Sequence, residues 1–288
     1  MTRRPDWLSF RRFAAFTTGL TLSLITLGIY TSATGSGLAC EAQWPLCSDQ
    51  LVPALVINPD FIEWFHRVVA MITGFLILGT AGWSWRLGDR KTMLTSTAAV
   101  VLLPLQISVG AVTVTLGGLV PGGYSPPTLA AHLLVALTIF TLLSLTTLFA
   151  YRNNHRRPPR ARGRLAVGLA LGALVISGLF SRGVPLLTYS TGAQAWFYTV
   201  SLVAFFGLLA AVVWLDDVDR IARWLAAGAL SVLFVTLLLG RDLVMYTGTI
   251  QQLNFGLYLL CVGLTAAGLW RIKTPAEQLV SRRSTHSD

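Results

Sequence analysis

The chain has 288 residues, of which 54% are hydrophobic and only 12% are charged, and its formal net charge is +10. An ordinary soluble domain carries about twice that share of charged residues, so the composition argues against a water-soluble globular protein. Basic domains often bind nucleic acid, but here the basic residues stand in short loops between long apolar stretches. This pattern is typical of a membrane protein whose loops set its orientation, and it predicts no nucleic-acid partner.

Eight apolar stretches are each long enough, at about 17–25 residues, to cross a lipid bilayer as a helix. The first follows Arg11-Arg12 and runs to about Tyr30, which is too long for the core of a cleaved signal peptide. The predicted fold class is therefore an all-α polytopic membrane protein of about eight transmembrane helices. The expected spans are residues 13–30, 62–85, 93–116, 128–151, 165–181, 194–215, 225–246 and 250–270.

The distribution of lysine and arginine predicts how the chain sits in the membrane. All but three of the 22 basic residues fall on one side, in the two terminal segments and in alternate loops; the exceptions are Arg67, Arg182 and Arg241. Basic segments stay on the cytoplasmic side. We therefore expect a multi-pass protein of the cell membrane with both termini in the cytoplasm and the 30–61 loop outside.

The basic segment 152–164 divides the chain into two halves of four spans each. We predict that residues 1–151 form an N-terminal four-helix bundle, residues 152–164 a cytoplasmic linker, and residues 165–288 a second bundle with a cytoplasmic tail. Short motifs recur in the same order in both halves, since Glu63-Trp64-Phe65-His66 resembles Ala195-Trp196-Phe197-Tyr198. This order indicates a duplication, with the bundles related by a pseudo-two-fold repeat.

Two of the four histidines lie inside spans, where an ionisable residue is costly and usually functional. His66 lies about one turn into the second span and His132 about one turn into the fourth, both counted from the outer side. Because these spans run in the same direction, the imidazoles are expected at similar depth. Two such imidazoles can hold heme iron axially inside a helix bundle; the alternative is two unrelated histidines bonded within the bundle. His155 and His286 are expected in solvent.

Two charged residues adjoin His66. Glu63 lies three residues before it and shares its helix face. A carboxylate there would stand at the edge of a bound heme and could exchange a proton, or it is simply paired with Arg67 or exposed to water. Arg67 could reach a heme propionate, or extend to the interface as an ordinary arginine. The spacing leaves these alternatives open.

The outer loop contains Cys40 and Cys47, with six residues between them. An extracytoplasmic location is oxidising, which favours a disulfide bond. Such a bond would close a short loop above the heme mouth, as a structural brace or as a redox-active lid. Cys261 lies in the last span and is expected to be a packing residue. A zinc site is not favoured, because no cluster of cysteines and further histidines lies near His66 or His132.

Taken together, these motifs resemble the heme A synthase family of cytochrome oxidase assembly proteins, over roughly residues 20–150. The segments that carry the resemblance are Thr34-Gly35-Ser36-Gly37, Cys40, Trp44-Pro45-Leu46-Cys47, Glu63-Trp64-Phe65-His66-Arg67, residues 106–113 and Ala131-His132-Leu133. Proteins of this family are built as two four-helix halves, in agreement with the repeat.

The resemblance implies oxidation of the C8 methyl group of heme O, through successive hydroxylations, towards the formyl group of heme A. By position, His66 and His132 would be the axial ligands of the substrate heme, whether heme O or heme B, and Glu63 the catalytic carboxylate. Cys40 and Cys47 would match the paired loop cysteines of many members. The implied partners are a heme O synthase, other oxidase assembly proteins and an electron donor that the sequence does not identify.

The second half departs from the family pattern. Members of this length usually carry a second histidine pair, in the sixth and eighth spans, that binds heme b. Here Tyr198 stands at the first position and Leu253-Asn254 at the second, so we expect no second heme. The main alternative function is a non-enzymatic heme-binding assembly factor. An electron-transfer protein and a transporter are less favoured, the latter because the polar groups lie at the outer ends of the spans rather than at the midplane.

Overall fold

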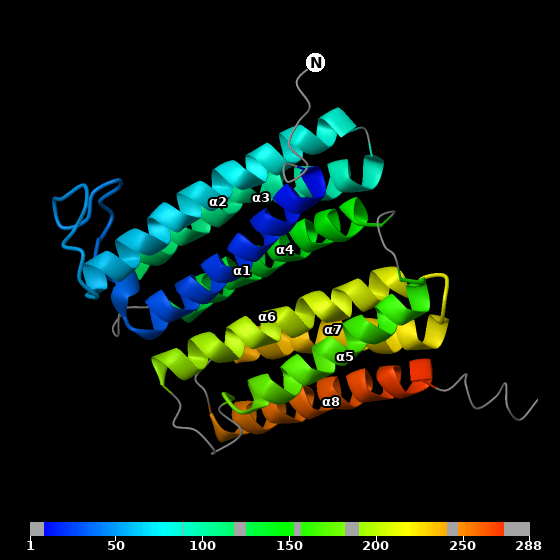
Figure 1. Cartoon of the computed structure of the whole chain (residues 1–288). Coiled ribbons are helices and arrows are strands. Elements are labelled where there is room, and N and C mark those ends of the chain that lie inside the picture. The colour runs from blue at the N-terminus through cyan, green and yellow to red at the C-terminus, as the bar shows by residue number, and fades with distance from the viewer. Residues whose placement is uncertain are drawn as a thin grey trace, which may run out of the picture.

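The computed structural model describes residues 9–87, 89–117, 125–152, 157–181, 190–240 and 247–273. Within these ranges the chain forms eight long helices and one short 3-10 turn (Figure 1). All eight helices are long and apolar enough to cross a membrane, so this is a multi-pass membrane protein. The elements are α1 (Phe10–Ala33), η1 (Ser36–Leu38), α2 (Pro59–Leu87), α3 (Arg90–Gly117), α4 (Pro126–Ala150), α5 (Pro159–Gly178), α6 (Thr191–Trp214), α7 (Arg220–Leu239) and α8 (Gly248–Lys273).

The helices form two four-helix bundles that lie side by side (Figure 1). In the first bundle α1 and α3 each pack against both α2 and α4, so α2 and α4 stand diagonally across the bundle from one another. In the second bundle α5 and α7 have the same relation to α6 and α8. This arrangement confirms the predicted all-α fold of two four-helix bundles.

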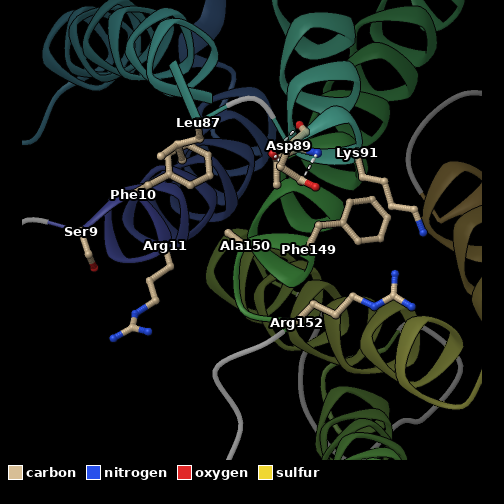
Figure 2. Close-up of a pocket in the computed structure, with 10 residues that line it drawn as sticks. Ser9, Phe10, Arg11, Leu87, Asp89, Lys91, Phe149, Ala150 and Arg152 are labelled. Carbon is tan, nitrogen blue, oxygen red and sulfur yellow. Dashed lines mark hydrogen bonds between the residues drawn. The ribbon is translucent and has the colours of Figure 1, made fainter. Parts of the chain in front are cut away.

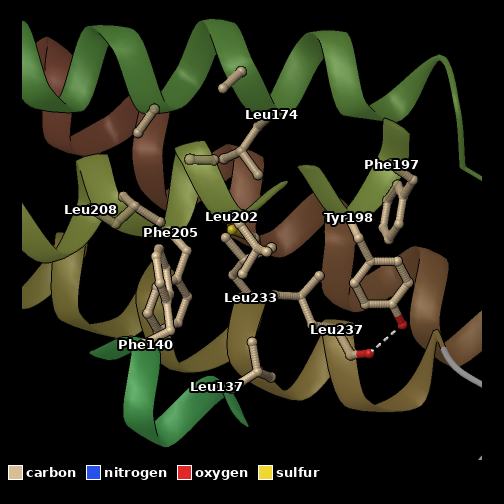
Figure 3. Close-up of a cluster of buried hydrophobic side chains, with 14 of the residues drawn as sticks. Leu137, Phe140, Leu174, Phe197, Tyr198, Leu202, Phe205, Leu208, Leu233 and Leu237 are labelled. Carbon is tan, nitrogen blue, oxygen red and sulfur yellow. Dashed lines mark hydrogen bonds between the residues drawn. The ribbon is translucent and has the colours of Figure 1, made fainter. Parts of the chain in front are cut away.

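The two bundles meet where α1 and α4 face α6. Phe140 of α4 and Phe205 of α6 pack with ring centroids 6.2 Å apart, and the hydroxyl groups of Thr26 and Thr199 are 3.0 Å apart. Figure 3 shows Leu137 and Phe140 of the first bundle against the buried side chains of the second. One apolar core therefore continues from one bundle into the other.

Hydroxyl pairs hold the helices of the first bundle together at one of its two ends. We call the end with the cysteines the loop end and the opposite end, where α1 begins, the basic end. Towards the basic end, hydroxyl pairs connect all four neighbouring helices, and such interhelical bonds help hold helices together in lipid. The pairs are Thr17–Thr80 at 3.2 Å, Thr18–Thr147 at 2.8 Å, Ser84–Ser96 at 2.8 Å and Thr95–Thr146 at 2.7 Å.

Two helix boundaries differ most from the expected spans. α5 begins at Pro159, inside the segment predicted to be the linker, because Pro158-Pro159 starts a helix whose first turns carry exposed arginines. Hydropathy alone does not detect such turns. α7 ends at Leu239 with Gly240 as its C-cap, seven residues before the expected end. The predictions for His155, Arg182, Arg241 and His286 concern residues outside the described ranges.

Candidate heme site

His66 and His132 lie on the diagonal helices of the first bundle at matched distances from the loop end. His66 is seven residues into α2 and His132 six residues into α4. At 1.5 Å of rise per residue, these positions lie about 10 Å and about 9 Å from the helix starts. The bundle therefore brings the two predicted ligands to one level on helices that face each other across its interior.

A glycine on the neighbouring helix faces each of the two imidazoles. A Cβ atom added at Gly28 of α1 would lie 3.0 Å from Cε1 of His66, and one added at Gly110 of α3 would lie 3.0 Å from Cε1 of His132. That separation is closer than normal packing of carbon atoms. Both rings thus occupy space that only a glycine leaves, and this repeated arrangement fits a pair of positioned imidazole ligands.

Gln106 contacts the imidazole of His132. Its side-chain amide nitrogen is 3.2 Å from Nε2 of His132, and it lies one turn before Gly110 on the same helix. With the amide as donor, Nε2 accepts through its single lone pair, so the amide must move aside before iron can bind at this nitrogen. From the sequence alone, Gln106 belongs to a family motif but has no assigned role; its spacing of four residues from Gly110 was the available signal.

Glu63 and Arg67 connect the outer loop to α2. The Glu63 side chain is buried, with 2% of the residue exposed. One carboxylate oxygen accepts a hydrogen bond from the backbone N–H of Cys40 at 2.6 Å, and the other is paired with Arg67. Arg67 also donates to the carbonyl oxygens of Gln43 at 2.6 Å and Glu41 at 2.7 Å. Of the alternatives left open by the sequence, the structure contains the Glu63–Arg67 ion pair.

Cys40 and Cys47 form a disulfide bond, as predicted, with their Cα atoms 4.4 Å apart. Both sulfur atoms lie near the backbone carbonyl of Asp60 in the first turn of α2, at 3.6 Å and 3.5 Å. The hydroxyl of Ser48 donates to the Asp60 carboxylate at 2.8 Å. The disulfide loop is thus fixed onto the start of the helix that carries Glu63 and His66. Cys261 is a buried free thiol, consistent with the predicted packing residue.

The corresponding positions of the second bundle hold other side chains. Tyr198 is seven residues into α6 and Asn254 six residues into α8, the same offsets as the two histidines. Asn254 is buried whereas Leu253 is 50% exposed, so Asn254 is the structural counterpart of His132. The Tyr198 hydroxyl donates to the carbonyl oxygen of Leu237 at 2.7 Å (Figure 3).

Glycines face these side chains as well. A Cβ at Gly240 would lie 3.3 Å from the amide nitrogen of Asn254, and one at Gly178 would lie 3.2 Å from the hydroxyl of Tyr258. Tyr258, one turn after Asn254, is buried and lies 2.8 Å from the Ser177 hydroxyl. Tyr258, which fills this bundle together with Tyr198, was not predicted from the sequence. The two halves thus share a glycine-lined frame around different side chains.

The described residues contain no group of three or more His, Cys, Asp or Glu side chains that could hold a metal ion directly. An iron porphyrin needs fewer protein ligands, because its ring supplies four of them.

Comparisons with known proteins identify relatives of this chain. Residues 57–271 match the family model described as cytochrome oxidase assembly protein. A heme A synthase of Bacillus licheniformis is 34% identical over 143 residues, which cover 49% of this chain and 45% of that protein. A heme A synthase of Geobacillus kaustophilus is 33% identical over 145 residues, covering 50% and 44%. A protoheme IX farnesyltransferase of Halobacterium salinarum is 35% identical over 122 residues, covering 42% and 26%.

The chain spans about half the length of the heme A synthases that it matches. The family model, in contrast, covers most of the chain, from α2 to α8, while α1 and the disulfide loop precede the matched range. With the paired histidines, the disulfide loop and the two-bundle fold, this match shows that the chain belongs to the heme A synthase family of cytochrome oxidase assembly proteins.

Proposed function

We propose that this protein is a membrane oxidoreductase of heme A formation, which oxidises the C8 methyl group of heme O towards the formyl group. The observation that carries the proposal is the pair of glycine-cradled imidazoles, His66 and His132, at one level on diagonal helices. The family match and the names of the relatives support it. By the positive-inside pattern, the site lies near the outer face of the cell membrane and both termini are cytoplasmic.

In this proposal His66 and His132 hold the substrate heme from its two faces. When bound, the iron porphyrin supplies the redox chemistry. Gly28 and Gly110 keep the space that the imidazoles need, and Gln106 holds the ring of His132 through Nε2 until the substrate displaces its amide. These contacts position the ligands before the substrate arrives, and such preorganisation lowers the ordering cost of binding.

Glu63 is our proposed catalytic carboxylate, because it lies on the His66 face of α2 and can give or take a proton at the edge of the substrate. Arg67 is the proposed partner of a heme propionate. An arginine has five N–H donors, and three bonds hold Arg67 to Glu63, Gln43 and Glu41. The remaining donors can reach a propionate while the loop stays in place.

The proposed partners are the enzymes before and after this step and a source of electrons. The match to part of a protoheme IX farnesyltransferase supports a farnesylated heme as substrate and a heme O synthase as neighbour. We propose that the second bundle holds no heme and serves in packing, because no histidine stands between positions 155 and 286. The oxidation would then use dioxygen as the oxidant, with the accompanying reducing electrons passed to the substrate heme directly from a partner protein.

A non-enzymatic heme-binding assembly factor is the second candidate, and one observation favours it. Both oxygens of the Glu63 carboxylate are already engaged, one by the N–H of Cys40 and the other by Arg67. A carboxylate used only to fix a loop has no need to touch a substrate. The two candidates therefore differ in what Glu63 does.

Co-expression with a heme O synthase, followed by extraction and identification of the bound hemes, tests the proposal. The wild type should contain heme A or its hydroxylated precursor. Glu63→Gln should keep heme but lose the oxidised product, whereas Glu41→Gln, an exposed carboxylate of the same loop, should keep both. Unmodified heme in the wild type, supplied with the cell's own electron donors, would contradict the enzyme and support the assembly factor.

A further inference from the structure

A cavity of about 430 Å³ lies at the basic end of the first bundle, opposite the disulfide loop (Figure 2). It is formed by the start of α1, the end of α2, the start of α3 and the end of α4. Its lining combines basic and apolar side chains, chiefly Arg11, Lys91, Arg152, Phe10, Leu87 and Phe149. None of these residues takes part in the proposed heme chemistry.

The cavity has an excess of positive charge. Among the residues that the structure describes, three cations line it against the single carboxylate of Asp89. Asp89 is already engaged, because one of its oxygens accepts bonds from the backbone N–H and the hydroxyl of Thr92 at 3.0 Å and 2.7 Å. Among the described residues, no carboxylate lies within ion-pair distance of Arg11, Lys91 or Arg152. The cations are thus available to a negatively charged ligand.

The start of α1 adds to this preference for an anion. The Ser9 side chain makes no capping bond to the first turn of α1, and its buried hydroxyl has no hydrogen-bond partner among the described residues. Uncapped N–H groups at a helix N-terminus attract phosphate and carboxylate groups. The uncapped start of α1 and the side chain of Arg11 therefore extend the anion-attracting lining of the cavity onto α1.

Aromatic rings hold two of the basic side chains over apolar surface. The Lys91 ammonium lies 5.6 Å from the ring centre of Phe149, and the Arg11 guanidinium lies 5.9 Å from that of Tyr151. Figure 2 shows Lys91 and Arg152 extending to the same side of Phe149, while Arg11 extends on the other. A ligand that fits needs an anionic head between these cations and an apolar part against Phe10, Leu87 and Phe149.

We propose that this cavity binds the headgroup of an anionic phospholipid. It opens at the ends of the membrane-spanning helices, where lipid headgroups lie. Basic pockets between membrane helices on the side of the basic loops bind acidic headgroups. The phosphodiester lies between the cations, and the start of the acyl chains follows the apolar wall. A soluble phosphate shares the charge but makes no use of that wall.

The test uses the purified full-length protein in a neutral detergent and measures its thermal unfolding as lipid is added. Phosphatidylglycerol should raise Tm with saturation, whereas phosphatidylcholine and inorganic phosphate at the same concentration should not. The triple variant Arg11→Gln/Lys91→Gln/Arg152→Gln should bind phosphatidylglycerol about a hundredfold more weakly, at roughly fivefold for each cation. The matched control Arg157→Gln/Arg160→Gln/Arg220→Gln removes the same charge from exposed positions of the basic segments and should bind within about twofold of wild type.

A second measurement does not depend on how the variants fold. A photoactivatable phosphatidylglycerol should label peptides containing residues 9–11, 87–92 or 149–152 of the wild type, and excess phosphatidylglycerol should suppress this labelling. Equal weakening in both triple variants, or labelling spread over all loops, would overturn the site. Saturation by inorganic phosphate alone would overturn the lipid as its source. A heme-free preparation serves equally well, so these results do not depend on the proposed function.

Discussion

At the scale of single residues, the candidate site depends on what faces the two histidines. The sequence was enough to predict His66, His132 and their common depth, because the spans and their direction follow from hydropathy and charge. It did not predict that Gly28 and Gly110 face the rings or that Gln106 contacts His132. Those contacts depend on how neighbouring helices rotate about their axes, which the apolar pattern of a lipid-exposed helix does not determine.

Gly28→Ala should weaken heme binding by about tenfold or more, because the added Cβ would lie 3.0 Å from Cε1 of His66 and displace the ring; a displacement that costs about 1.4 kcal/mol corresponds to that factor. Gly19→Ala in the same helix is the control, since a Cβ there meets nothing within 4 Å. Heme titration of both purified variants measures the difference. Equal affinity of the two variants would show that the space beside His66 does not matter.

Arg67→Gln should destabilise the loop end, because it leaves the buried Glu63 carboxylate without its cation. Removing one partner of a buried ion pair costs about 3–5 kcal/mol. We expect a clear fall in Tm and faster proteolysis within residues 39–50, measured against Arg86→Gln, an exposed arginine of the same helix. An unchanged Tm and unchanged proteolysis would mean that the pair does not fix the loop.

At the scale of the elements, the span count was predicted correctly, while the ends of α5 and α7 were not. The count depends on eight long apolar runs, but helix ends depend on local capping that hydropathy ignores. At the start of α3 the cap is visible, since Asp89 accepts bonds from the N–H and hydroxyl of Thr92. These bonds hold the pKa of Asp89 below its usual value.

The lowered pKa of Asp89 predicts how the stability of the protein changes at acidic pH. Because the folded pKa of Asp89 is lowered, its contribution to stability is complete above the unfolded pKa of about 3.9 and is lost as the pH falls through the folded value. Asp89→Asn keeps a capping side chain without the charge. Thermal unfolding between pH 7 and pH 3 should show a smaller loss of Tm below pH 4 in the variant. A loss as steep as in wild type would mean that Asp89 does not contribute to the acid response.

At the scale of the whole molecule, the two bundles share one frame but only the first carries histidines. The second bundle is filled by buried side chains at the corresponding level, with Tyr198, Leu202 and Leu237 fully enclosed (Figure 3). The sequence was enough to predict that the second bundle lacks a histidine pair. It did not predict that side chains fill the interior of this bundle, because Tyr258 stands at a position that corresponds to neither histidine. Where the first bundle has its histidines, the second bundle thus has Tyr198 and Asn254, and the core around them is packed differently.

Restoring the ligands should therefore not restore a second heme. In Tyr198→His/Asn254→His the imidazoles would stand in a close-packed interior, and opening space for a porphyrin would cost more than two axial bonds return. We expect the heme content per chain to equal that of wild type, with a lower Tm. One additional heme per chain, measured by pyridine hemochrome assay against protein concentration, would show that space remains between α6 and α8.

The central claim is that His66 and His132 jointly hold one heme between α2 and α4. Electron paramagnetic resonance of the purified protein, with heme and protein quantified on the same sample, tests it most directly. We expect about one low-spin heme per chain with two imidazole ligands, and loss of that signal in both His66→Ala and His132→Ala. An unchanged low-spin signal in either variant would contradict it.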